Sequence, residues 1–309
     1  MSAVTSDGPA LVLLERILSL DSLRWAWHRV RGNKGIAGGD GVTLARFARL
    51  LDANLLALAD EVRAGSYRPG TMRRLRLRKG HKLRLISVLP VRDRVLQRAT
   101  LDAIGPLVEP LFHPGSFGYR PHRSLHDAVA RIVRLRDRGL CWVIDADIRD
   151  CFGTLDHDLL RQFLARVLPD ADLQRLLAVW IAWAGADVER GIPQGAVVSP
   201  LFCNIYLHHL DEGLRRRRLQ IVRYADDFVV LCKSREHARW ALRALEKVMG
   251  GLRLELHPQK TQVVSFDEGF DFLGVHFEGT DYSYLYEGKR ITVDVLPPEF
   301  FHYHADGYE

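Results

Sequence analysis

The order of hydrophobic and polar positions predicts helical and extended segments that follow one another along the chain. Residues 11–66 show helical periodicity, broken by the glycine-rich stretch 32–41. Residues 67–90 alternate basic with apolar side chains, which is typical of a β-hairpin with a cationic face. Residues 93–138 return to a mostly helical pattern. The first half of the chain is therefore predicted to be helical with one inserted hairpin.

The second half predicts a sheet. An apolar strand ends at Asp147, an apolar helical pair covers residues 156–186, and an amphipathic helix covers residues 235–250. One helix face is formed by Leu201, Ile205, Leu207, Leu210 and Leu214. We expect the neighbouring Asp211 and Glu212 of that helix to be solvated. This order of elements predicts an α+β protein, an antiparallel sheet with helices on one face.

Two adjacent acids, Asp226 and Asp227, interrupt the apolar run 221–232 at the point where two short strands would be joined by a turn. A pair of like charges between strands costs stability unless a cation binds there. A third acid, Asp147, ends another apolar strand. Mg²⁺ prefers oxygen ligands, and two such ions about 4 Å apart are typical of phosphoryl transfer. The three carboxylates therefore predict a metal-dependent phosphoryl-transfer site.

Short motifs spread over most of the chain carry a resemblance to a known family. They lie at residues 35–41, 79–84, 93–97, 117–121, 147–152, 191–195 with 199–201, 224–227, 260–261 and 272–274. In this order they resemble the reverse transcriptases, within the bacterial branch of group II intron and CRISPR-associated enzymes. The resemblance implies an RNA-directed DNA polymerase, with the fingers and palm of a right-hand polymerase fold.

The resemblance also implies a domain order. Residues 1–66 would be a helical N-terminal extension, 67–140 the fingers, and 141–275 the palm, with a helical fingers insertion at about 156–190. Residues 276–309 would be a C-terminal tail or the start of a thumb or fused domain. Because 34 residues are too few for a three-helix thumb, we expect the thumb to be absent or truncated, or supplied by a partner.

By family position, Asp147, Asp226 and Asp227 would hold two Mg²⁺ ions, for which Mn²⁺ is an expected substitute. The backbone carbonyl of Ile148 would be a further metal ligand. A primer 3′-hydroxyl would then attack the α-phosphate of a dNTP, a reaction that depends on positioning and charge neutralisation. Lys260 would neutralise or protonate the departing pyrophosphate.

Further residues are assigned to the incoming dNTP by the resemblance. Lys79 and Arg84 of the basic hairpin would bind its triphosphate, although Arg78 or Lys82 could take the place of Lys79. Without the resemblance, a basic edge strand protected from aggregation is an equal interpretation of this hairpin. Two more predicted contacts are Phe152, which would exclude a ribose 2′-hydroxyl, and Gln194. A core position beside the strand is compatible with the role of Phe152.

The remaining site predictions concern nucleic acid. Arg120 lies in the segment that resembles the template-facing part of the family, for which a solvated loop is the alternative. The primer strand would be braced by Phe272, Leu273 and Gly274. The run of four arginines at 215–218 either complements a helix dipole or contacts a phosphate backbone. Expected partners are therefore an RNA template, a DNA or RNA primer, dNTPs, and a fused or separate integrase.

Composition agrees with these predictions without deciding them. The 309 residues carry a net charge of +6, which suits a polyanionic partner, although many basic proteins bind no nucleic acid. The four cysteines lack zinc-site spacing and are predicted to be reduced core thiols. No apolar run approaches the ~20 residues that span a bilayer, and the first residues lack the pattern of a signal peptide. We therefore expect a cytoplasmic protein without a membrane segment.

Two other functions stay open. One is a non-catalytic RNA-binding role, such as a maturase-type splicing factor, and the other is a template-independent nucleotide transferase of a phage-defence system. The chain departs from many intron-encoded relatives at Gly153 and Ala196, neither of which would remove a metal ligand. The absence of recognisable intron accessory segments favours a CRISPR spacer-acquisition enzyme over an intron protein.

Overall fold

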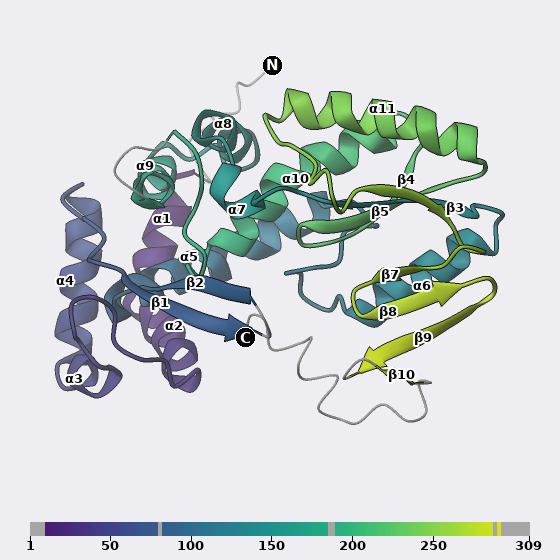
Figure 1. Ribbon diagram of the computed structural model, residues 1–309. Helices are drawn as coiled ribbons and strands as arrows, with labels where there is room; N and C mark the ends of the chain where they lie inside the picture. The colour runs from purple at the N-terminus through teal and green to yellow at the C-terminus, as the bar shows by residue number, and fades with distance from the viewer. Residues whose placement is uncertain (1–9, 80–81, 185–188, 287–288, 292–309) are drawn as a thin grey trace, which may run out of the picture. The chain divides into compact units, whose positions relative to one another are not determined.

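The computed structural model describes residues 10–79, 82–184, 189–286 and 289–291 (Figure 1). The chain divides into two compact units, of which the first comprises Met1–Pro110 and Leu155–Ile205. The second comprises Leu111–Thr154 and Tyr206–Glu309. Within the described ranges, no helix is both long enough and apolar enough to cross a membrane. The predicted boundaries of fingers and palm stay a prediction.

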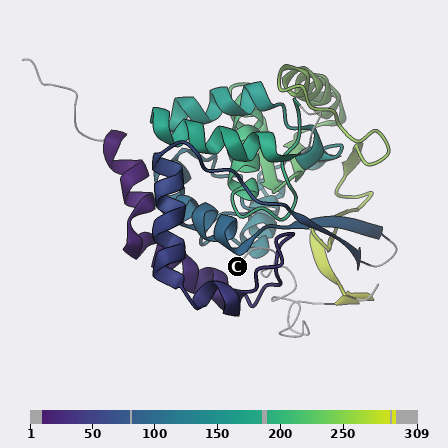
Figure 2. The same ribbon diagram turned by 90° about the vertical axis from the view of Figure 1, so that its left-hand side faces the viewer.

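The first unit is mainly helical and contains one β-hairpin. Its elements are α1 (Ala10–Leu18), α2 (Leu20–Gly32), α3 (Leu44–Ala48), α4 (Leu51–Arg63), β1 (Arg73–Lys79), β2 (Lys82–Val88), α5 (Val91–Val108), α8 (His157–Val167), α9 (Ala171–Ile181) and the start of α10 (Ser199–Arg215), with 3₁₀ turns at Glu109–Leu111 and Ala182–Ala184. The hairpin extends away from the helices of this unit (Figure 2). The predicted hairpin and the helical pair of residues 156–186 are both present.

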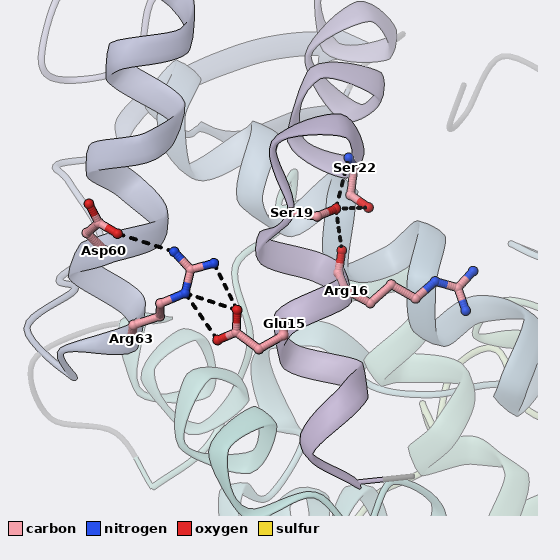
Figure 3. Close-up of polar contacts among 6 residues, drawn as sticks. All are labelled: Glu15, Arg16, Ser19, Ser22, Asp60 and Arg63. Carbon is pink, nitrogen blue, oxygen red and sulfur yellow. Dashed lines mark hydrogen bonds and ion pairs between the residues drawn. The ribbon is translucent and has the colours of Figure 1, made fainter. Parts of the chain in front are cut away.

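Polar side chains set the starts and contacts of the first helices. Ser19 is the N-cap of α2, since its hydroxyl accepts a hydrogen bond from the Ser22 amide at 3.3 Å (Figure 3). On α4, the guanidinium of Arg63 donates to both carboxylate oxygens of Glu15 on α1 and to Asp60. These contacts lie at the surface; those with Glu15 join two helices that are far apart in the sequence, and the one with Asp60 lies within α4.

A buried polar network holds the base of the hairpin. Asp93 on α5 accepts hydrogen bonds from the Tyr67 hydroxyl at 2.6 Å and from the Gly70 amide at 3.0 Å. The Trp180 indole N–H donates to the Tyr67 hydroxyl at 3.2 Å. Burial raises the pKa of Asp93, which its hydrogen bonds partly oppose. Because buried polar groups are costly unless they are paired, this network specifies where the hairpin begins.

The second unit holds the predicted sheet. Its elements are the end of α10, α6 (Leu125–Arg136), β3 (Trp142–Asp147), α7 (Cys151–Thr154), β4 (Gln220–Tyr224), β5 (Asp227–Cys232), α11 (Arg235–Gly251), β6 (Gln262–Ser265), β7 (Phe270–Phe272), β8 (Val275–Glu278), β9 (Asp281–Tyr286) and β10 (Lys289–Ile291). The central sheet has the strand order β4-β5-β3-β6, and all of its neighbours are antiparallel.

Apolar side chains on both faces of this sheet are covered. Val143 of β3 and Val229 of β5 pack in one core cluster with Ile132 of α6, whereas α11 contacts the sheet from the other side (Figure 1). Successive residues of a strand point to opposite faces, and Ile144, next to Val143, is fully buried as well. The expected α+β architecture is confirmed. Helices cover both faces rather than one because both sets of alternate positions are apolar.

Strands between residues 275 and 291 add to a second sheet in this unit. β7 to β10 form it in the order β10-β9-β8-β7, and Phe272, Val275 and Tyr284 belong to the same core cluster as α6. The four cysteines are free, and three of them are buried as expected. The core position expected for Cys141 was wrong: this residue is exposed, because β3 begins only at Trp142.

Candidate active site

Two of the predicted acids face one another across neighbouring strands. Asp147 is the last residue of β3, Asp227 is the first residue of β5, and the strand register pairs them directly. Residues opposite one another in an antiparallel pair have Cβ atoms about 4.5–5.5 Å apart on the same face. The fold therefore brings together two carboxylates that are 80 positions apart in the sequence.

The third acid lies in the turn between β4 and β5. Tyr224 pairs with Asp227, which leaves Ala225 and Asp226 as a two-residue hairpin loop. Ala225 has a φ of +58°, the positive value that type II′ turns require at their first central position. A side chain in this conformation is strained, so the surrounding structure must hold the turn in place.

The loop before α6 supports this turn. The Phe117 amide donates to the Arg223 carbonyl at 2.8 Å, so the loop pairs with the edge strand β4. A Cβ atom on Gly118 would lie 2.2 Å from the Ala225 nitrogen, so only glycine allows this approach. The glycine of the 117–121 motif therefore packs its backbone against the acidic turn.

A buried arginine also holds the turn. The Arg223 guanidinium donates to both oxygens of Asp211 on α10, at 2.9 and 2.7 Å. It also donates to the Ala225 carbonyl at 2.8 Å and to the Ser116 hydroxyl at 2.8 Å. The side chains of Arg223 and Asp211 are both 0% exposed. One guanidinium thus connects α10, the loop before α6 and the turn that carries Asp226.

The prediction that Asp211 is solvated was wrong. Glu212, its neighbour on α10, is partly exposed and pairs with Arg215 instead. Asp211 falls on the apolar face of the helix, at the spacing of Leu207 and Leu214, and its charge is tolerated there because Arg223 neutralises it. Its position within an apolar stripe was the available signal for a buried partner, as was the single charge of Arg223 between apolar strand residues.

The positive charge of Lys260 lies next to the paired acids Asp147 and Asp227 and affects their electrostatics. Its ammonium group forms an ion pair and hydrogen bond with Asp147, which raises the pKa of Lys260. Although Asp227 is exposed, partial desolvation of its carboxyl group raises its pKa to about 7, with further increases from the charges of Asp226 and Asp147. Lys260 opposes that rise. The cluster therefore carries excess negative charge that a cation would stabilise.

The donor set suits a hard divalent ion. Mg²⁺ is usually held by one or two carboxylates together with substrate phosphates, and Asp147 and Asp227 offer two facing carboxylates. Among the described residues, no three His, Cys, Asp or Glu side chains are grouped closely enough to hold an ion as they are placed. The three-acid cage therefore stays a prediction. Ile148, a further predicted ligand, follows Asp147 and bridges to Leu256.

Phe152, five positions after Asp147 in the chain, pairs with a second aromatic residue. Phe152 on α7 is buried, and its ring meets that of Tyr119 edge to face, with centroids 6.4 Å apart. Tyr119 directly follows Gly118, which lies against the acidic turn. A Cβ atom on Gly153, where the chain departs from the intron pattern, would lie 2.1 Å from the Asp150 carboxylate, so a larger residue would require the Asp150 side chain to move. Phe152 thus has the core position that its sequence context allowed.

The predicted dNTP residues of the first unit lie on two connected elements. Lys79 ends β1, and Arg84 lies in β2 opposite Leu77; the side chains of both residues lie outside the described part of the structure. The Gln194 carbonyl accepts a hydrogen bond from the Ser87 amide of β2 at 2.9 Å, and the Gln194 side chain is exposed. The 191–195 turn is thus attached to the hairpin. Their roles toward a nucleotide stay predictions.

Gln97 completes this attachment. Its side-chain carbonyl, which is fully buried, accepts hydrogen bonds from the amides of Val197 and Val198 at 2.9 and 3.4 Å. A Cβ atom on Gly195 would lie 2.4 Å from the Ser87 carbonyl. The motif residues Gln97 and Gly195 therefore serve the packing of the first unit.

The predicted nucleic-acid residues of the second unit are partly engaged in the fold. Arg120 is buried, and it donates to the carbonyls of His113 and Ser116 at 2.9 and 2.7 Å. Phe272 belongs to the core cluster. It pairs with Val275 across the β7–β8 hairpin, which leaves Leu273 and Gly274 as the tip of the turn. Both tip residues have positive φ, as type I′ hairpins require. Contacts of these residues with template or primer stay predictions.

Comparison with known proteins places the chain in a family. A model of the reverse transcriptase (RNA-dependent DNA polymerase) family matches residues 77–277, which is more than half of the chain and includes all three acids. The chain belongs to the reverse transcriptase family. Reverse transcriptases generally use divalent metal ions, in agreement with the acidic site described above.

Two curated relatives extend the match. Protein YkfC of Escherichia coli (strain K12) is 33% identical over 308 residues, covering 85% of this chain and 80% of YkfC. The group II intron-encoded protein LtrA of Lactococcus lactis subsp. cremoris is 24% identical over 335 residues, again covering 85% of this chain. The chain spans 56% of the length of LtrA.

Solved structures agree with the fold. The telomerase of Candida albicans, in complex with a fragment of telomeric RNA, matches with a TM-score of 0.54 and 15% identity. That match covers 80% of this chain and 50% of the telomerase chain. At this identity the likeness concerns the fold alone, and it confirms the right-hand polymerase class that the motifs predict.

Proposed function

We propose that this chain is an RNA-directed DNA polymerase that adds dNTPs to a primer 3′-hydroxyl by two-metal-ion phosphoryl transfer. The observation that carries the proposal is the direct pairing of Asp147 with Asp227 at the ends of β3 and β5, beside the turn of Asp226. This pairing lies inside the segment that matches the family. Facing carboxylates on rigid strands are the arrangement that such chemistry needs.

Asp147, Asp226 and Asp227 would hold the ions, with the Ile148 carbonyl as a further ligand. Bound Mg²⁺ or Mn²⁺ would supply Lewis acidity toward the 3′-hydroxyl and the phosphate oxygens. Lys260 keeps a positive charge next to Asp147, since its pKa is raised, and would neutralise or protonate the departing pyrophosphate. The remaining site residues would contribute to catalysis by positioning the primer and the dNTP.

Four further residues are proposed to recognise the nucleotide. Lys79 and Arg84 would bind its triphosphate, Gln194 would contact it near the primer end, and Phe152 would exclude a ribose 2′-hydroxyl. Two observations support a fixed Phe152: the ring is buried and packs against Tyr119. This part of the proposal predicts a preference for dNTPs over NTPs, which Phe152→Ala would weaken.

Primer extension tests the proposal. A labelled DNA primer annealed to an RNA template is incubated with dNTPs and Mg²⁺, for the wild type, Asp227→Asn and Asp226→Asn. The matched control is Asp267→Asn, an exposed aspartate in the same unit. We expect template-coded products from the wild type and the control, and a loss of at least about a thousandfold in both site variants. Chelation of the metal should abolish all extension.

The outcome separates the proposal from its alternatives. Addition that continues when the template is omitted, with a product independent of its sequence, would identify a template-independent nucleotide transferase. RNA binding without extension by the wild type would support the non-catalytic, maturase-type role. Full activity of Asp227→Asn would contradict the assignment of the site.

The biological system belongs to the proposal as well. An RNA template and a DNA or RNA primer are the proposed partners, and a bacterial retroelement or a spacer-acquisition system is the proposed setting. The relation to LtrA is compatible with an intron origin. An integrase or a thumb-supplying protein is a further proposed partner, which co-purification from the native host would identify.

A further inference from the structure

A basic pocket of about 340 Å³ lies beside α6, in the same unit as the acidic turn. The residues that line it include Phe117, His122 and Arg123 of the loop before the helix and Asp127, Arg131 and Arg134 of the helix itself. The three helical residues are spaced at i, i+4 and i+7, so they share one face of α6. The helix thus presents two arginines to the pocket that its preceding loop completes.

The single carboxylate of the pocket is already engaged. Asp127 forms a capping box with Ser124, in which its carboxylate accepts from the Ser124 amide at 2.8 Å and from the hydroxyl at 2.7 Å. These hydrogen bonds lower the pKa of Asp127. Within the described residues, Arg131 and Arg134 form no ion pair. The arginines of the pocket therefore keep most of their positive charge uncompensated.

Arg131 is the central residue of the pocket. It is half-buried, and its Nε atom is buried without a hydrogen-bond partner. Burial and the nearby charges of Arg134, Arg138 and Arg123 lower the pKa of its guanidinium, which reflects the repulsion among them. An oxyanion at this place would supply acceptors for the unused N–H groups and relieve that repulsion.

We propose that this pocket binds a phosphate group of a nucleic-acid backbone, at a site separate from the catalytic acids. The proposal rests on the proposed function, in that the bound strand would belong to the template–primer duplex. A chain of phosphates is favoured over a single anion because the positive row continues from Arg131 through Arg134 to Arg138. Arg138 lies two residues beyond the last residue of α6, so the row extends past the end of the helix. Arginine forks match phosphate oxygens in two-point contacts.

The test measures binding without catalysis. Fluorescence anisotropy of a labelled RNA–DNA duplex, in buffer without metal or dNTPs, gives affinities between about 50 and 200 mM salt. Arg131→Gln with Arg134→Gln should weaken binding about tenfold and reduce the slope of log K against log salt by about 1 to 2, because each lost phosphate contact contributes about 0.9. Arg134→Gln alone, at an exposed position, should give about half of the change in slope.

The control is Arg239→Gln with Arg243→Gln, two exposed residues one turn apart on α11, which makes the same charge change. An equal loss in control and pocket variants would overturn the proposal, since the effect would then be one of net charge. So would an unchanged slope in Arg134→Gln when circular dichroism shows the native fold. If millimolar inorganic phosphate at constant ionic strength removes the difference between wild type and variant, the pocket is a free-phosphate site and the backbone assignment fails.

Different results would contradict the polymerase proposal and the pocket proposal. A wild type that binds the duplex through the pocket but extends no primer would contradict the polymerase proposal and leave the pocket in place. Pocket variants that bind and extend like the wild type would contradict the pocket and leave the polymerase in place.

Discussion

Two arginines of this protein bind carboxylates in the same forked manner, but in different surroundings. Arg63 of α4 contacts Glu15 and Asp60 at the surface, with side chains 39%, 53% and 74% exposed (Figure 3). Arg223 of β4 contacts Asp211 with both side chains 0% exposed. Water screens the first set of charges, whereas the second pair was desolvated during folding.

The difference shows what each pair contributes. An exposed pair gains little because solvent competes for both partners. The buried pair contributes little net stability over an apolar replacement, but the loss of one partner leaves an uncompensated charge. Arg223 in addition donates to the carbonyl of the strained Ala225. The buried pair therefore positions the turn that carries Asp226, and the exposed pair only joins two helices.

The largest effect is expected from Arg223→Ala. This change leaves the Asp211 carboxylate buried without a counter-charge, which should lower the free energy of unfolding by about 3–5 kcal/mol. Urea denaturation followed by circular dichroism measures the change. A loss below about 1 kcal/mol would mean that water reaches Asp211 and that the comparison with Arg63 fails.

A double replacement separates charge from positioning. Arg223→Met together with Asp211→Leu removes both buried charges, so most of the stability lost in the single variant should return. The carbonyl of Ala225 and the hydroxyl of Ser116 would still lack their donor, which should leave a deficit of about 1–3 kcal/mol. Primer extension should stay impaired although the protein is folded. Normal extension by the folded double variant would show that the turn needs no such support.

Lys260→Met examines a pair of intermediate burial, since Lys260 is 48% exposed and Asp147 is 14% exposed. We expect a loss of about 0.2–1 kcal/mol in the free energy of unfolding, because solvent screens the ammonium group. The pKa of Asp227 should rise above its value of about 7, since Lys260 is the charge that lowers it. An NMR titration of the aspartate carboxyl groups without metal would detect this rise. An unchanged pKa would place Lys260 away from Asp227.

The smallest effect is expected from Arg63→Ala. Its exposed contacts with Glu15 and Asp60 should contribute at most about 1 kcal/mol, and this contribution should fall as salt is added. Urea denaturation at low and high salt measures both quantities. A loss as large as that of Arg223→Ala would show that burial does not separate these two pairs.

The strands and the turn that carry the three acids were predicted from local patterns, whereas the contacts that support them were not. An acidic pair between two apolar runs predicts the β4–β5 hairpin, because a turn is the only place in that sequence where charges reach solvent. The prediction that Asp211 is solvated was wrong, because helical periodicity indicates the face on which a residue lies but not which residue of another segment contacts that face. Arg223, 12 residues away, was passed over for the same reason.

The sequence by itself determined the family, the hairpin of Asp226 and Asp227, the strand that ends at Asp147 and the basic hairpin of β1 and β2, because each depends on residues that are neighbours in the chain. Only the tertiary structure decided the register that sets Asp147 opposite Asp227, the burial of Asp211 and the pocket around Arg131. Register, burial and pockets depend on contacts between distant segments, whose pairing follows from the packing of the whole sheet and its helices.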